Sequence, residues 1–191
     1  VDATGIYNAS ITYAADLLAQ KLIDDFESDL SFWTETGNAF GIAPNGKYQE
    51  LSVTGLKGSG VVSSYIKAKD PGIGTLTSPE IEITGDKMSF LISGGKLDGK
   101  LCMNLIVDGQ VVRTATGENH STMRTVIWDI LEYKNKMATL EIVDSYSGGW
   151  GHIDIDHIEM LGVPSEPDAE NAEVLFSINN NATPIQIKLP S

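Results

Sequence analysis

The chain has 191 residues, of which 41% are hydrophobic, and its 26 acidic and 13 basic side chains give a net charge of −13. This length suffices for one domain with a buried core and appendages. The charge would repel nucleic acid phosphates, and no run approaches the roughly 18 consecutive apolar residues of a membrane helix. We therefore expect neither a nucleic acid partner nor a membrane-spanning segment. The single cysteine, Cys102, excludes an internal disulfide.

The N-terminal part of the chain predicts one short helix. Over residues 7–22, apolar side chains recur at helical spacing, among them Ile11, Ala14, Leu18 and Leu22. We interpret residues 1–23 as an N-terminal extension that carries this helix.

From residue 22 onward the pattern changes to that of strands. Short runs rich in Val, Ile, Thr and Leu alternate with Gly, Asp, Asn, Pro and Ser clusters, which is typical of an all-β sandwich. The expected strands cover residues 22–27, 31–36, 48–54, 60–67, 74–84, 87–93, 101–107, 110–116, 123–130, 137–144 and 152–161. The sandwich domain is expected to span residues 24–163.

Asp108-Gly109 predicts a tight two-residue hairpin between strands 101–107 and 110–116. Such a turn pairs Val107 with Gln110 and, two residues further along each strand, Leu105 with Val112. In this register Asn104 lies opposite Arg113.

The run His152-Ile153-Asp154-Ile155-Asp156 alternates polar and apolar residues, so its isoleucines face the core and its polar side chains face away. Ile158 and Met160 break this alternation, which predicts a bulge near Asp156 or His157. Acidic side chains on one face could bind calcium, which prefers six to eight oxygen ligands. Glu27 and Asp156 are the predicted metal ligands, if the first and last strands pair. The alternative is a solvated acidic face, and no other cofactor is expected.

Beyond the sandwich, residues 164–172 contain two prolines and three acidic side chains, which indicates a linker. Residues 173–191 follow with two short runs of strand character. We expect these tail strands to form a hairpin, to join the edge of the sandwich or to begin a neighbouring domain.

The sequence lacks a Gly-x-Ser-x-Gly elbow, a Walker loop, a Rossmann fingerprint and a His-Glu-x-x-His site. Sugar binding requires fewer specific residues than these catalytic motifs do. It needs an exposed aromatic ring, side chains such as arginine and carboxylates that can hydrogen-bond two neighbouring hydroxyls, and rigid loops. Trp150 is flanked by Gly148, Gly149 and Gly151, which favours a loop at the surface, whereas Trp33, Phe40 and Trp128 are expected in the core. The candidate ligand-binding residues near the loops are Lys96, Arg113, Glu118, Asn119, Asp144 and Trp150.

Several motifs occur in a familiar order. They are the segment 74–81, the run Phe90–Gly95, the hairpin with its Arg-Thr-Ala-Thr-Gly continuation over 104–117, Trp128-Asp129, and Gly148–Ile153. Over about residues 24–161 the chain resembles the fructan-binding β-sandwich modules, carbohydrate-binding module family 66, that are attached to bacterial levanases and inulinases of glycoside hydrolase family 32.

The resemblance implies a non-catalytic, jelly-roll-like sandwich that holds the terminal fructose units of levan or inulin. It further implies a catalytic domain in the same protein, which would be a partner in cis, and an extracellular, cell-surface or periplasmic location. We expect Arg113 and an acid, Glu118 or Asp144, to grip sugar hydroxyls, with Trp150 shaping the pocket. The alternative is a structural spacer that packs on its own catalytic domain and binds no sugar.

Overall fold

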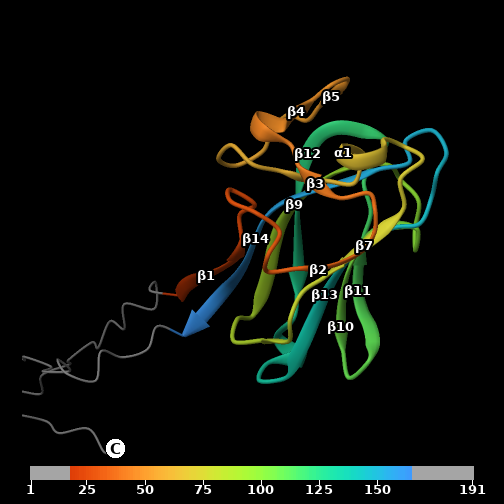
Figure 1. Cartoon of the computed structure of the whole chain (residues 1–191). Coiled ribbons are helices and arrows are strands. Elements are labelled where there is room, and N and C mark those ends of the chain that lie inside the picture. The colour runs from red at the N-terminus through yellow and green to blue at the C-terminus, as the bar shows by residue number, and fades with distance from the viewer. Residues whose placement is uncertain (1–17, 165–191) are drawn as a thin grey trace, which may run out of the picture.

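The computed structural model of the chain describes residues 18–164, which fold into two antiparallel β-sheets packed face to face (Figure 1). The first sheet has the strand order β12-β9-β14-β6-β3, with β1 beside β14. The second sheet has the order β11-β10-β13-β7-β2, with β8 beside β13. The predicted all-β sandwich is therefore confirmed.

Most of the strands lie close to the predicted runs. Their bounds are β1 Leu18–Asp24, β2 Thr34–Gly37, β3 Gly41–Ile42, β4 Lys47–Tyr48, β5 Leu51–Ser52, β6 Val62–Ser63, β7 Gly74–Thr77, β8 Ile81–Glu82, β9 Lys87–Gly94, β10 Leu101–Val107, β11 Gln110–Ala115, β12 His120–Asp129, β13 Met137–Asp144 and β14 Ile153–Pro164. A single turn of α-helix, α1 (Tyr65–Ala68), and two 3₁₀ turns, Pro44–Gly46 and Leu131–Tyr133, complete the described elements.

The core lies between the two sheets and follows the period of two along each strand. In β13, Ala138, Leu140 and Ile142 are buried while the residues between them are partly exposed. Trp33, Phe40 and Trp128 all belong to this core, as predicted. Asp144 is the last of these inward-facing residues of β13, so its carboxylate is buried at the end of the core.

A third layer covers the outer face of the first sheet. Segment 43–66, which we call the covering segment, runs over this face except at β6, which belongs to the sheet itself. It packs a second apolar cluster that includes Leu51, Val53 and Val61 against Met123 of β12. This segment lies at the upper end of Figure 1, around β4, β5 and α1. Asp154 and Asp156 are buried on the outer face of β14, and His152, which precedes the strand, is buried as well. The solvated acidic face considered as an alternative is therefore wrong.

The first and last described strands pair, because β1 runs antiparallel to β14 with Asp24 opposite Ile158. The predicted bulge is present: the register between β14 and β9 shifts between Asp156 and Glu159, and His157 has a φ of 47°. The shift returns Ile158 and Met160 to the core. Most of the helix predicted over 7–22 lies outside the described residues, but its end, residues 18–22, is strand, since β14 supplies a ladder of backbone partners.

The Asp108-Gly109 hairpin forms with Val107 opposite Gln110, as predicted. A register shift between Leu105 and Ile106 then places Leu105 opposite Arg113 and Asn104 opposite Thr114. The predicted pairing of Asn104 with Arg113 is therefore wrong by one residue, because the bulge inserts an extra residue into β11.

The described part of the chain contains no helix with the length and apolar character needed to cross a membrane. The tail strands predicted over 173–191 and nearly all of the predicted linker lie outside the described residues. The division of the chain into extension, sandwich, linker and tail stays a prediction.

Candidate functional site

Trp150 sits in a tight loop between β13 and β14. Its own φ is +59°, in the left-handed region, and its side chain is 41% exposed. The glycines around it allow this path: a side chain on Gly151 would meet the carbonyl oxygens of Gly148 and Asp70, and one on Gly148 would meet the ring of Tyr146. The loop therefore presents a large aromatic ring to solvent on a closely packed backbone.

The inner face of the Trp150 ring stacks on His152, with ring centroids 5.7 Å apart and an angle of 26° between the planes. Tyr65 meets the imidazole edge-on at 5.2 Å. His152 is only 7% exposed, and its Nδ1 lies 2.8 Å from Asp70 Oδ1. Because a carboxylate only accepts, Nδ1 is the donor, and neutral His152 keeps an acceptor at Nε2. Nε2 is buried and has no hydrogen-bond partner within residues 18–164.

Asp144 lies in the same region, at the end of β13, and is 1% exposed. Burial raises the pKa of this carboxyl from 3.8 to about 6, although the Ser64 hydroxyl and the Tyr146 N–H, 3.2 Å away, act in the opposite direction. Its Oδ2 has no partner among the described residues. Two buried hydrogen-bonding atoms, Asp144 Oδ2 and His152 Nε2, thus remain unpaired near the Trp150 loop.

A glycine pair, Gly94-Gly95, joins this loop to a second one. Gly95 N donates to His152 O at 2.8 Å, and Asn119 N donates to Gly94 O at 2.8 Å. A side chain on Gly95 would strike the Trp150 carbonyl oxygen. Asn119 has a φ of 57° and accepts a hydrogen bond from Lys96 N at its Oδ1. Asn119 thereby braces the turn after β9, and the exposed Lys96 follows the pair.

Glu118 belongs to this second loop, and its Oε1 lies 3.4 Å from Nε of Arg124 in β12. Arg124 Nη2 also donates to Thr116 O at 2.8 Å. The predicted residues Lys96, Glu118, Asn119 and Trp150 therefore lie in loops that meet at Gly94-Gly95, and Asp144 ends the strand that leads into the Trp150 loop. Arg124 was not predicted, because nothing in its strand pattern distinguishes it from a solvent-facing arginine.

Arg113, predicted to grip sugar together with Glu118 or Asp144, lies apart from these loops. Its guanidinium donates to Asp129 O at 3.0 Å, to Val112 O at 2.8 Å and to Glu132 Oε1 at 2.5 Å, and it packs over the Tyr133 ring. These contacts raise the pKa of Arg113, chiefly through the Glu132 carboxylate. The side chain ties β11 to the turn that follows β12.

The predicted calcium ligands bind backbone amides in the structure. Glu27 accepts hydrogen bonds from Ser59 N at 2.7 Å and Gly60 N at 2.8 Å. The Ser59 hydroxyl, which also donates to Glu27, lowers the pKa of this carboxyl most, and the two backbone amides lower it further. Asp156 accepts from Lys57 N at 2.7 Å, while burial raises the pKa of Asp156 to about 6.

Only one carboxylate oxygen of this pair, Asp156 Oδ1, has no partner among the described residues, whereas calcium prefers six to eight oxygens. Residues 18–164 also contain no cluster of three or more His, Cys, Asp or Glu side chains suited to a metal. The pair as it stands fits amides better than a cation, and calcium binding at Glu27 and Asp156 stays a prediction.

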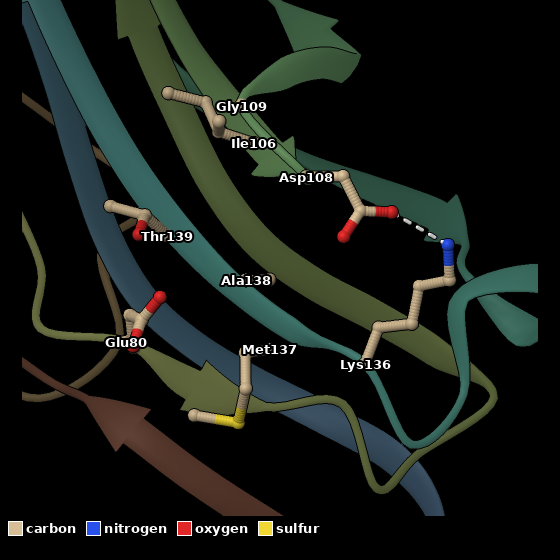
Figure 2. A pocket seen from close by; sticks show the side chains of 8 residues that line it. All are labelled: Glu80, Ile106, Asp108, Gly109, Lys136, Met137, Ala138 and Thr139. Atoms are coloured by element: carbon tan, nitrogen blue, oxygen red, sulfur yellow. Dashed lines mark hydrogen bonds and ion pairs between the residues drawn. The ribbon is translucent and has the colours of Figure 1, made fainter.

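A separate open hollow of about 460 Å³ lies over the hairpin end of the second sheet. Figure 2 shows Lys136 reaching across to Asp108, and their charged groups are 2.7 Å apart. Met137 and Glu80 line its other side. Met137 begins β13 and Asp144 ends it, so this hollow lies at the opposite end of the sandwich from Trp150. None of the predicted site residues lines it.

No family model matches the chain. A curated protein of Aspergillus rugulosus, ecdE, provisionally named a glycosyl hydrolase, is 32% identical over 143 residues, or 72% of this chain. The chain spans 20% of the length of that protein.

Three solved structures resemble the fold at low identity. The K2 adhesin domain of Lys-gingipain has a TM-score of 0.49 at 14% identity, covering 74% of this chain and 99% of the adhesin domain. A cyclase from Fischerella sp. TAU has a TM-score of 0.47 at 15% identity, covering 78% and 100%. A carbohydrate-binding module of family 29 has a TM-score of 0.42 at 12% identity, covering 75% and 88%. These similarities are too low to bear on function.

Proposed function

We propose that this chain is a non-catalytic carbohydrate-binding domain that holds the terminal fructose units of fructans, and that it accompanies a glycoside hydrolase domain in a longer protein. The observation that carries the proposal is Trp150, a residue 41% exposed whose ring stacks on His152 at the end of the sandwich. A ring that already has a packing partner loses little conformational freedom when it packs against the apolar face of a sugar.

The surroundings of the ring supply the polar half of such a site. Asp144 Oδ2 and His152 Nε2 are buried and unpaired among the described residues, and an unpaired buried polar atom costs free energy unless a partner arrives. Sugar hydroxyls both donate and accept, so they suit either atom chemically. Because both atoms are buried, a hydroxyl would reach them only after the neighbouring Trp150 loop shifts. The identity with the Aspergillus rugulosus protein supports a link to glycoside hydrolases, and the ordered motifs described above support the fructan class.

Isothermal titration calorimetry with levan, inulin and fructose, each with and without calcium, tests the proposal. We expect measurable heat with at least one fructan. Binding to cellulose or xylan fragments alone would contradict the fructan assignment and leave sugar binding standing. The absence of heat with every glycan would refute sugar binding and favour a spacer that packs on its own catalytic domain.

A further inference from the structure

A hollow opens where β12 bulges away from β9. His120 pairs with Gly94 and Arg124 pairs with Ile92, so residues 121–123 of β12 all lie opposite Ser93. The covering segment holds the bulge out, because Thr54 N donates to Ser121 O at 2.9 Å and Met123 N donates to Thr54 O at 2.8 Å. The resulting hollow measures about 260 Å³ and is lined by Ile92, Ser93, Glu118, His120, Thr122, Met123 and Arg124.

The charged groups at this hollow keep free hydrogen-bonding capacity. Arg124 makes one short hydrogen bond, to Thr116 O, and a longer contact of 3.4 Å to Glu118. Among the described residues, the buried Arg124 Nε has no hydrogen-bond partner within bonding geometry. The Arg113 guanidinium, by contrast, already donates hydrogen bonds to Val112 O, Asp129 O and Glu132 Oε1. Arg124, rather than Arg113, is therefore the arginine available to a ligand.

The hollow's chemistry suits a neutral ligand with several hydroxyls. The side chains of Glu118 and Arg124 carry opposite charges, so neither an anion nor a cation meets a net complementary charge, and the chain's charge of −13 further disfavours an anion. A guanidinium fork and a carboxylate match neighbouring hydroxyls in donor and acceptor pattern. His120 Nδ1 accepts from Thr122 N, which leaves Nε2–H of the neutral ring as a donor. Ile92 and Met123 supply apolar surface.

The hollow also lies close to the Trp150 loop. His120, Gly94 and Ile153 follow one another across β12, β9 and β14, which places the two outer strands about 10 Å apart. We propose that the β12 hollow binds a second sugar unit of the fructan whose terminal unit lies at Trp150, with Arg124 and Glu118 gripping its hydroxyls. This inference rests on the proposed function.

Calorimetry with fructose and with a fructan trisaccharide separates the two sites. Arg124→Lys keeps the charge and removes the fork, and Glu118→Gln, in an exposed loop, removes the acceptor charge. We expect each variant to weaken trisaccharide binding by about tenfold, with fructose affinity changed by less than about twofold. Glu80→Gln, in the separate hollow of Figure 2, is the matched control and should change neither.

The outcomes distinguish the two proposals. If the unmodified chain binds the trisaccharide and Glu118→Gln, still folded by circular dichroism, binds it equally well, the hollow is not a subsite and the proposed function stands. An equal loss for fructose and the trisaccharide would overturn the assignment to a second unit. No binding of any fructan by the unmodified chain refutes the proposed function and this inference together.

Discussion

At the scale of single residues, the three tryptophans show how far local sequence identifies a role. Trp33 and Trp128 each lie in a run of strand character and are 6% exposed in the core, whereas Trp150 lies among glycines and is 41% exposed. The glycine flanks are a reliable signal because a residue with positive φ in a tight turn cannot continue a regular strand.

Replacing Trp150 with alanine should weaken fructan binding by about tenfold or more, because the sugar loses its aromatic plate. Trp150→Phe keeps a ring and should retain most of the affinity. Calorimetry measures both, and thermal unfolding should show little change, since the ring is partly exposed and outside the core. Unfolding of Trp150→Ala would instead assign the ring a structural role.

Asp144 should make the domain less stable as the pH rises from about 4 to about 7. Its pKa is raised to about 6 when folded, so the folded state binds this proton more tightly than the unfolded chain. The stabilisation is present below the unfolded pKa and is lost as the pH rises through 6, by on the order of 2–3 kcal/mol.

Urea unfolding at both ends of this pH range measures the loss. Asp144→Asn should remove the Asp144 share and leave a comparable share from Asp156, whose pKa burial also raises to about 6. Asp98→Asn, a substitution of an exposed carboxyl, should leave the loss unchanged. A pH dependence that is identical in Asp144→Asn and the unmodified chain would show that Asp144 is not its source.

At the scale of elements, the sequence pattern predicted one bulge, in β14, and missed two others, in β11 and β12. The bulge after Asp156 was visible because Ile158 and Met160 break the alternation in β14. The shift in β11 was not visible, since Val111, Val112 and Arg113 offer no comparable break. This one-residue register shift in β11 places Arg113 opposite Leu105 instead of opposite Asn104. The triple bulge in β12, which forms the hollow, depends on the covering segment and has no signal in β12 itself.

The junction of the two loops at Gly94-Gly95 should not tolerate a side chain. In Gly95→Ala the new methyl group meets the Trp150 carbonyl oxygen and the Leu101 side chain, so the Trp150 loop must move. We expect a lower melting temperature and weaker fructan binding. Gly149→Ala, in the same loop with open space around it, is the control and should affect both far less. Equal behaviour of the two variants would show that the junction does not position Trp150.

The Glu27–Asp156 carboxylates hold the turn over residues 57–60, so Glu27→Ala should lower the melting temperature by removing the acceptor for Ser59 and Gly60. Glu82→Ala, at the exposed residue of β8, is the control.

The melting temperature of the unmodified chain, measured in calcium and in chelator, tests the predicted metal. Calcium should raise the melting temperature if these carboxylates bind it, and identical melting curves in the unmodified chain would contradict calcium binding.

At the scale of the whole molecule, three layers replace the two that the strand pattern predicted. The covering segment packs on the outer face of the first sheet, where its Lys57 N–H donates to Asp156. It also supplies Tyr65 to the His152 ring and Thr54 to the β12 bulge. Both parts of the proposed sugar site therefore depend on this layer.

The chain itself should not hydrolyse fructans, because a binding domain has no need of a paired acid and nucleophile. A reducing-sugar assay on levan and inulin, with an active fructan hydrolase as positive control, should detect no release. Release of sugar that survives repeated purification and disappears in an Asp144→Asn variant would contradict the non-catalytic assignment and make this buried carboxyl a catalytic candidate.

The sequence by itself determined most of the strands, the aromatic core, the exposed Trp150 and the β14 bulge, because each depends on neighbours a few residues away through alternation or turn chemistry. Only the tertiary structure decided that Glu118 contacts Arg124, that Arg113 is used elsewhere, and that Asp144 and His152 are buried. These outcomes depend on which loops meet and what covers each sheet face. Such contacts join residues far apart in the chain and follow from packing, which leaves no periodic trace in the sequence.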